Sequence, residues 1–194
     1  MKFDKRLFFG SLAVAAVASV GIGYLVSQAN DSPSDRSDGV TLNSTADVQP
    51  PGIGTNAVVA GKPFPAVDIE TLDGAIVNTR DLLGQPLVVN IWYSTCVPCR
   101  KELPALAEVH AEYGDRVRFV GINPLDSPEV NETFARDRGV QYELYGDPDG
   151  RFTAAAGIVT APVTLIVTPN GTIVRQTGEL TADKLRAILE TEFP

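Results

Sequence analysis

The sequence contains few of the residues that metal sites and cross-linked folds use. Two cysteines in 194 residues exclude a small fold that is held together by several disulfides. A single histidine excludes a histidine-rich metal site and makes a Ser-His-Asp triad depend on one residue. Basic residues are outnumbered by acidic ones, 16 to 24, which gives a net charge of −8. Nucleic-acid affinity comes from Lys and Arg that neutralise phosphates, so we expect no nucleic-acid partner.

Charge is also absent from a long stretch near the N-terminus. Residues 1–6 carry three basic side chains and one acidic one, whereas residues 7–26 carry no charge. About 20 apolar residues are enough to cross the hydrocarbon core of a bilayer as a helix. Basic residues before such a run favour a cytoplasmic N-terminus. We therefore expect a basic cytoplasmic stub at 1–6 and a transmembrane signal-anchor at 7–27.

A cleaved signal peptide is the alternative interpretation of the same segment. Ser27-Gln28-Ala29 offers the small-x-small pattern that a signal peptidase accepts. The apolar run is longer than the roughly 7–15 residues of a signal peptide core, which favours a retained anchor. Both interpretations place the rest of the chain outside the cytoplasm. The expected product is a single-pass protein of the cell membrane with its folded domain on the extracytoplasmic side.

Residues 28–57 differ in composition from the remainder of the chain. Ser, Thr, Asn, Asp, Gly and Pro fill most of this stretch. Such a segment cannot bury enough apolar surface to offset the entropy lost on ordering, so it predicts a disordered linker. The folded domain is then expected at residues 58–194.

Within the domain, apolar runs of strand length alternate with helical patterns. The expected strands lie at 67–70, 75–77, 87–93, 117–122, 142–145, 163–167 and 172–175. The expected helices lie at 97–113, 128–138 and 182–191, with a helical turn at 152–156. The runs at 87–93 and 117–122 are mostly apolar, as is typical of strands buried on both faces. Strand–helix–strand alternation that ends in a hairpin and a helix predicts an α/β fold with a mixed central sheet flanked by helices.

Both cysteines lie where a buried strand leads into a helix, as Cys96-Val97-Pro98-Cys99. The free N–H groups and the dipole at a helix N-terminus favour negative charge, so the pKa of Cys96 should fall below its free value. A Cys96 thiolate can attack a disulfide in another protein, and Cys99, one turn further on, can resolve the mixed disulfide. Pro98 fixes φ within the first turn. The pattern predicts a redox dithiol.

Two other interpretations of the cysteine pair remain open. The spacing also occurs in half of a zinc site, although there is no second pair and one histidine cannot complete four ligands. The pair also fits an inert structural disulfide, although so short a loop would contribute little stability.

The residues from Trp92 to Pro104 resemble the active-site segment of thioredoxin-fold proteins. They are most similar to the membrane-anchored TlpA/ResA-like thiol-disulfide oxidoreductases, over residues 58–194 and in the layout of anchor and linker. The resemblance rests on Trp92 before the motif, on Pro104 within the helix, on Pro162 in the segment Thr160–Thr164, and on Gly146–Gly150 followed by Gly157-Ile158. It implies a thioredoxin-like fold and a disulfide reductase.

The resemblance also implies roles for individual residues. Pro162 is expected to be cis and to face the dithiol as part of the catalytic site, and the backbone of Ala161 to pair with an extended substrate peptide. Trp92 and Pro98 are expected to contribute to the substrate surface. Glu102 matches the acidic residue that ResA-like members place near the dithiol, and it would serve in proton transfer. A solvated glutamate on the helix surface is the alternative for this residue.

Asn90 departs from thioredoxin, which has a buried Asp at the corresponding place. An amide cannot exchange a proton as a carboxylate does, so that route is closed. Thr95 replaces the second Trp that the family often has before its first cysteine.

The implied substrates are exported proteins that contain cysteine, among them apocytochromes, and the implied electron donor is a membrane thiol carrier. No cofactor or metal is expected beyond the Cys96–Cys99 disulfide, and a monomer is expected. A thiol peroxidase is an alternative. Peroxidases of the related fold place their reactive cysteine after a motif of Pro and Thr and near an Arg; Thr95 and Arg100 match this pattern, although the proline before them is missing. A copper carrier of the same fold is another, although no histidine follows His110.

Overall fold

A computed structural model of the protein describes residues 55–194. The expected cytoplasmic stub, the expected signal-anchor and nearly all of the expected linker therefore lie outside the described residues. Within residues 55–194, no helix combines the length and the apolar character needed to cross a membrane.

The described residues form seven strands and five helical segments in the alternating order that the sequence predicts. The strands are β1 (Asp68–Thr71), β2 (Ile76–Asn78), β3 (Leu87–Ile91), β4 (Arg118–Asn123), β5 (Glu143–Gly146), β6 (Val163–Val167) and β7 (Ile173–Thr177). The helices are the 3-10 helix η1 (Thr79–Leu82) and the α-helices α2 (Val97–Tyr113), α3 (Pro128–Arg136), α4 (Arg151–Ala155) and α5 (Ala182–Glu192). Helix α2 has the expected bounds, whereas β3 ends two residues earlier than expected.

All seven strands belong to one mixed sheet, in the order β2-β1-β5-β4-β3-β6-β7. Strand β3 lies between β4 and β6, and it runs parallel to β4 and antiparallel to β6. Strand β5 is parallel to β4, and the pairs β6–β7, β1–β5 and β1–β2 are antiparallel. The mixed thioredoxin-like sheet expected from the sequence is confirmed.

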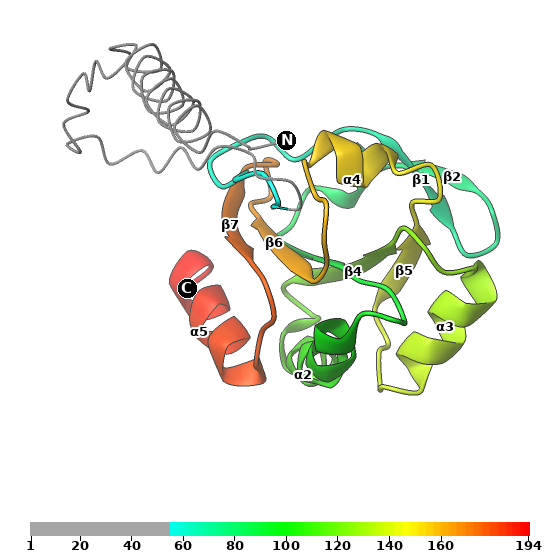
Figure 1. Cartoon of the computed structure of the whole chain (residues 1–194). Helices are drawn as coiled ribbons and strands as arrows, with labels where there is room; N and C mark the ends of the chain where they lie inside the picture. Colours follow the sequence, from blue (N-terminus) through cyan, green and yellow to red (C-terminus); the bar gives the residue numbers. More distant parts are fainter. Residues whose placement is uncertain (1–54) are drawn as a thin grey trace, which may run out of the picture. The chain divides into compact units, whose positions relative to one another are not determined.

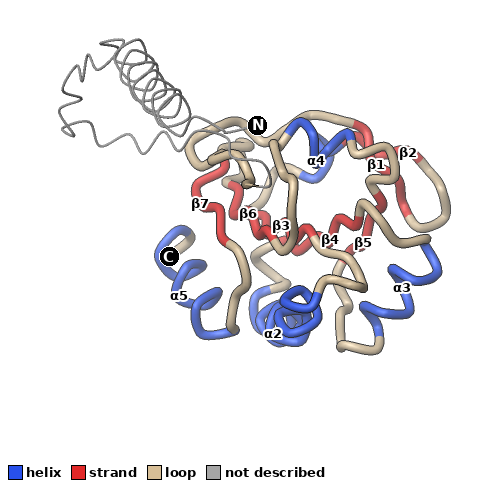
Figure 2. The backbone as a smooth tube through the Cα atoms, viewed as in Figure 1, coloured by secondary structure: helices blue, strands red, loops and turns tan. Residues whose placement is uncertain are grey.

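Helices cover both faces of the sheet. Helices α2, α3 and α5 lie on one face, and α4 lies on the other (Figure 1). Figure 2 shows the strands as a continuous band between these two layers. The loop from β3 to α2 and the loop from β4 to α3 leave the sheet at the same edge, because the two strands are parallel.

Strand β3 supplies both halves of the core. All five of its residues are buried. Val89 and Ile91 pack in the cluster that contains Phe152, and Val88 packs in the cluster that contains Leu103. Successive side chains on a strand point to opposite faces, so Asn90 faces the same layer as Val88. A polar side chain is thereby directed toward helix α2.

The domain begins earlier than the composition predicts. Asn56 and Ala57 were expected in the linker, but both are hydrogen-bonded to the loop that precedes β6. The boundary at residue 58 is therefore at least two residues too late. Composition could not reveal this, because these two residues dock by polar contacts to residues about 100 positions away rather than by burying a large apolar side chain.

Candidate active site

The two cysteines form a disulfide at the N-terminus of α2. Cys96 is the N-cap residue, and its sulfur accepts a hydrogen bond from the backbone N–H of Cys99 at 3.2 Å. A sulfur atom thus occupies the position that a Ser or Asp oxygen usually takes at a helix start. When the pair is reduced, the same N–H and the helix dipole stabilise a thiolate on Cys96.

The two sulfur-bearing residues differ in access to solvent. Cys96 is 5% exposed, whereas Cys99 is fully buried. Of the two residues between them, Val97 is 61% exposed and Pro98 is half-buried within the first turn of α2. An incoming disulfide can therefore reach Cys96 more readily than Cys99, which is the geometry expected of an attacking and a resolving cysteine.

Glu102 lies one helical turn beyond Cys99 and is 1% exposed, which excludes the alternative of a solvated surface residue. Its Oε1 accepts a hydrogen bond from Asn90 Nδ2 at 2.7 Å, and its Oε2 accepts one from the backbone N–H of Leu180 at 3.1 Å. Asn90 Nδ2 also donates to Thr164 Oγ1 at 3.1 Å. The carboxyl group is therefore bound by Asn90 of β3 and by the backbone of Leu180, two residues before α5, and Asn90 is bound in turn to Thr164 of β6.

Burial governs the protonation of this carboxyl group. Loss of solvent raises the pKa of Glu102 from 4.5 to about 7, although the hydrogen bonds from Asn90 and Leu180 favour the charged form. Residues three apart on a helix lie on the same face, so Glu102 and Cys99 are neighbours in the protein interior. A carboxyl group that titrates near neutral pH is suited to exchange protons with a buried thiol.

Trp92 was expected on the substrate surface, and the structure contradicts this. Its side chain is fully buried and stacks on Phe134 of α3, with 5.8 Å between ring centroids. β3 ends at Ile91, so Trp92 begins the connecting loop and turns its ring into the layer under α2 and α3. The side chain therefore packs the base of the active-site loop and does not face a substrate.

Asp126 is a site residue that the sequence analysis did not find. Its carboxylate accepts hydrogen bonds from the backbone N–H of Ser94 at 2.6 Å and from Ser94 Oγ at 2.7 Å. Asn123 Nδ2 donates to the same carboxylate at 2.8 Å. These bonds fasten the residue two before Cys96 to the loop that follows β4. The available signal was that parallel strands β3 and β4 end at one edge, which brings their following loops together.

The peptide bond between Ala161 and Pro162 is cis, as the resemblance implies. The next residue, Val163, begins β6 and pairs with Ile91, the last residue of β3. Antiparallel pairing therefore places Pro162 beside the start of the loop that carries Cys96. Ala161 packs against the hydrophobic cluster that contains both cysteines.

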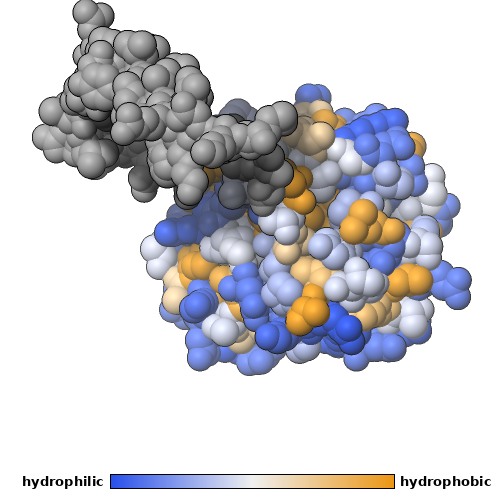
Figure 3. Space-filling model, in the orientation of Figure 1, coloured by the Kyte–Doolittle hydropathy of each residue, from blue (hydrophilic) through white to orange (hydrophobic). Residues whose placement is uncertain are grey.

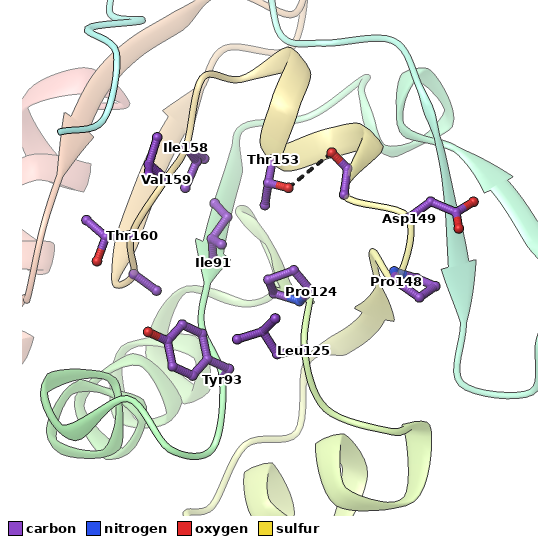
Figure 4. Close-up of a pocket in the computed structure, with 12 residues that line it drawn as sticks. Ile91, Tyr93, Pro124, Leu125, Pro148, Asp149, Thr153, Ile158, Val159 and Thr160 are labelled. Carbon is purple, nitrogen blue, oxygen red and sulfur yellow. Dashed lines mark hydrogen bonds between the residues drawn. The ribbon is translucent and has the colours of Figure 1, made fainter. Parts of the chain in front are cut away.

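A groove of about 380 Å³ lies next to this proline loop. Figure 4 shows Ile91 within the ring of lining side chains, with Tyr93 and Leu125 near one another and Val159 and Thr160 on the loop that precedes Pro162. Leu125 is 69% exposed and Val159 is 67% exposed. On the face of the domain that Figure 3 shows, apolar residues are scattered among polar ones. The groove is lined partly by apolar side chains and extends to Ala161, the residue before Pro162.

Within residues 55–194 there is no group of three His, Cys, Asp or Glu side chains arranged to hold a metal ion. His110, the single histidine, packs edge-on against Phe119 and Tyr142 at the far end of α2, and burial lowers its pKa. It serves as a packing residue.

The AhpC/TSA family matches residues 60–176, which is more than half of the chain. This chain belongs to the AhpC/TSA family. The thiol:disulfide interchange protein HelX of Rhodobacter capsulatus is 33% identical to this chain over 183 residues, which cover 92% of this chain and 90% of the relative. The thiol-disulfide oxidoreductase ResA of Halalkalibacterium halodurans is 26% identical over 194 residues, or 98% of both chains.

Solved structures agree with this assignment. A secreted disulfide oxidoreductase of Mycobacterium tuberculosis, described as homologous to DsbE of E. coli, is 25% identical with a TM-score of 0.58. The match covers 65% of this chain and 96% of that chain. This AhpC/TSA family member is therefore a thiol-disulfide oxidoreductase with a thioredoxin-like fold, and Cys96 and Cys99 are the only cysteines available to it.

Proposed function

We propose that this oxidoreductase is anchored to the cell membrane and reduces disulfides in exported proteins, including cysteine-containing apocytochromes c. The apolar segment 7–27 supports an extracytoplasmic domain, as does the similarity to a protein described as secreted. The relatives ResA and HelX are named as a thiol-disulfide oxidoreductase and a thiol:disulfide interchange protein, which supports thiol-disulfide exchange as the activity.

The buried carboxyl group of Glu102 is the observation that supports reduction, rather than oxidation, of the substrate. A negative charge one helical turn from Cys99 disfavours thiolates in the reduced dithiol. A reduced form that is less stabilised gives its electrons away more readily, which lowers the reduction potential. Val97 and Pro98, between the cysteines, add no cationic side chain that would reverse this effect.

The reaction then proceeds in two exchange steps. The Cys96 thiolate attacks one sulfur of a substrate disulfide, which forms a Cys96–substrate disulfide and releases the other substrate sulfur as a thiolate that takes up a proton. Cys99 loses its proton to the Glu102 carboxylate and attacks the Cys96 sulfur. This step forms the Cys96–Cys99 disulfide and releases the second substrate thiolate. The disulfide in the structure is the product of this reaction.

Substrate docking uses the loop beside Pro162. The backbone of Ala161 pairs with an extended segment of the substrate in the manner of strand addition. The exposed Val97 and the half-buried Pro98 complete the surface around Cys96. A membrane thiol carrier then returns two electrons to the Cys96–Cys99 disulfide, and the anchor keeps the domain near that carrier.

The reduction potential of the Cys96–Cys99 pair tests this proposal. Full-length protein equilibrated in dithiothreitol or glutathione buffers should give a value closer to about −270 mV, which is typical of thioredoxin, than to about −120 mV, which is typical of a strong oxidant. A value above about −180 mV would mean that the protein donates disulfides. Consumption of hydrogen peroxide without reduction of protein disulfides would instead support a thiol peroxidase.

A further inference from the structure

The side chain of Asn56 binds the loop that leads into Pro162. Asn56 Oδ1 accepts hydrogen bonds from the backbone N–H of Val159 at 2.7 Å and of Thr160 at 2.9 Å. Asn56 Nδ2 donates to the carbonyl oxygen of Thr160 at 2.9 Å. One amide group therefore bonds both backbone groups of Thr160, the residue directly before Ala161.

A close backbone approach supports these bonds. The backbone N–H of Ala57 donates to the carbonyl oxygen of Gly157 at 2.8 Å. Gly157 has φ +61°, and a Cβ atom placed there would lie 2.6 Å from the Cβ of Ala57. Glycine is the residue that permits both this backbone conformation and this contact. Both residues of the segment at 56–57 thus contact the loop: Asn56 through its side chain and Ala57 through its backbone and methyl group.

The opposite side of the segment is held by the edge strand β7. Gln176 Nε2 donates to the carbonyl oxygen of Ala57 at 3.0 Å, and Gln176 Oε1 accepts from the backbone N–H of Val59 at 2.9 Å. Val59 is buried in the core cluster that contains Phe64. Asn56 therefore belongs to a segment that is attached to β7 and to the core, and its side chain links the proline loop to them.

The same segment also borders the other side of that loop. A second groove, of about 290 Å³, is lined by Asn56, Val58, Ala60, Pro162, Val163, Gln176, Thr177 and Gly178. The first groove, by contrast, is lined by the loop residues before Pro162. Asn56, which the sequence assigns to the end of the linker, thus lines this groove together with Pro162, beside the expected docking site for a polypeptide.

We propose that Asn56 is a positioning residue that fixes the backbone of Thr160 and Ala161 for the docking of an extended polypeptide substrate. Asn56 does not touch the reacting sulfur atoms, and it acts through the loop. The folded domain therefore includes the last residues before Val58 as part of its substrate-binding apparatus. This inference rests on the proposed function only in naming a polypeptide as the molecule that docks.

The test compares three variants of the full-length protein. Asn56→Ala removes all three side-chain hydrogen bonds to the loop. Asn56→Asp keeps the acceptors for Val159 and Thr160 and removes the donor to the Thr160 carbonyl. Asn78→Ala is the matched control, since Asn78 is also half-buried, donates to Asp68 and accepts from the backbone N–H of Arg80, but lies in β2 at the opposite end of the sheet.

Reduction of insulin in the presence of dithiothreitol measures docking of a protein substrate. Asn56→Ala should raise KM for insulin roughly fivefold to tenfold, as expected for the loss of more than one hydrogen bond. The equilibrium constant of the dithiol with dithiothreitol, which sets its reduction potential, and the rate of its reduction by dithiothreitol should stay within about twofold of wild type. Asn56→Asp should recover most of the lost affinity, and Asn78→Ala should match wild type. An unchanged KM in Asn56→Ala, or an equal loss with insulin and dithiothreitol, would overturn the proposal.

Hydrogen exchange tests the positioning itself without a substrate. The amide protons of Val159 and Thr160 should exchange at least fivefold faster in Asn56→Ala than in wild type, while amides in α2 keep their wild-type rates. Exchange that is unaltered at these two amides would reject the role of Asn56. If wild-type protein failed to reduce insulin at all, the proposed function would fail, whereas the exchange rates would still decide whether Asn56 fixes the loop.

Discussion

Asn90 and Glu102 form a buried polar pair that joins strand β3 to helix α2. Asn90 Nδ2 donates to Glu102 Oε1 at 2.7 Å, and both residues are 1% exposed. Asn90 Oδ1 has no hydrogen-bond partner within residues 55–194. A rotated amide would present this oxygen to a protonated Glu102, so Asn90 can serve either protonation state of the carboxyl group. An asparagine at this place thus supports proton exchange without exchanging a proton itself.

The first prediction concerns stability as a function of pH. Folding raises the pKa of Glu102 to about 7, so between pH values of about 4.5 and 7 the folded protein keeps a proton that the unfolded chain has lost. The unfolding free energy should therefore fall as pH rises through this window, by up to about 3 kcal/mol. Glu102→Gln should abolish this fall, as measured by denaturant unfolding of the oxidised protein at a series of pH values. The exposed Glu132→Gln is the control and should keep the wild-type profile.

A second prediction concerns the resolution of mixed disulfides. If the Glu102 carboxylate accepts the Cys99 proton, the rate of resolution should rise through a pH of about 7 in the wild-type protein. Glu102→Gln should slow resolution tenfold or more and move the rise toward the ordinary thiol pKa of about 8.5. Rapid-mixing measurements of the decay of a mixed disulfide would show both effects. An identical pH midpoint in the variant would contradict the role of Glu102.

The third prediction concerns the order of the two cysteines. Cys96 is the N-cap residue and is the more exposed of the two, so we expect it to attack and Cys99 to resolve. Cys99→Ser should leave long-lived mixed disulfides with substrate proteins, visible on non-reducing gels. Cys96→Ser should leave none, because the remaining thiol is buried. Equal trapping by both variants would reject this order.

The fourth prediction concerns the contact between Gly157 and Ala57. Gly157→Ala should lower the unfolding free energy by about 2–4 kcal/mol, because it adds strain at a positive φ and a clash with the Ala57 methyl group. Gly74→Ala is the matched control, since Gly74 has φ +87° and no atom within 4 Å of an added Cβ, and should cost only about 1–2 kcal/mol.

The clash can also be separated from the strain. Combining Gly157→Ala with Ala57→Gly removes the opposing methyl group, so the double variant should recover the part of the loss that exceeds the control. Denaturant unfolding of the four proteins in this cycle gives the coupling energy. Strict additivity would mean that the segment at residues 56–57 does not pack on Gly157 as the structure has it.

Much of the fold could be predicted from local sequence. Buried strands are marked by mostly apolar runs, and α2 is bounded by Cys96 at its start and Gly114 after its end. The position of the dithiol at a helix start follows from the same local pattern. The 3-10 helix η1 was not expected, because its four residues form a single turn that is held by Asn78 and carries no periodic pattern.

The contacts around the site required the tertiary structure. Whether Trp92 faced a substrate or the interior depended on Phe134 of a later helix, and the role that the resemblance implied for Trp92 was the wrong choice. Whether Glu102 was solvated depended on the backbone of Leu180, 78 residues away. Asp126 was not recognised because its partner, Ser94, lies 32 residues earlier on a different loop.

The sequence by itself determined the chemistry of this protein, because a thiol pair at a helix N-terminus is set by neighbours within a few residues of Cys96. It also determined the layered α/β architecture, because the spacing of apolar side chains indicates which strands and which helix faces are buried. Only the tertiary structure decided which polar groups surround the dithiol. Burial of Glu102, attachment of Ser94 to Asp126 and docking of Asn56 on the proline loop all join residues that are at least 30 positions apart. Strand order and loop packing bring such pairs together, and no local sequence pattern specifies either of them.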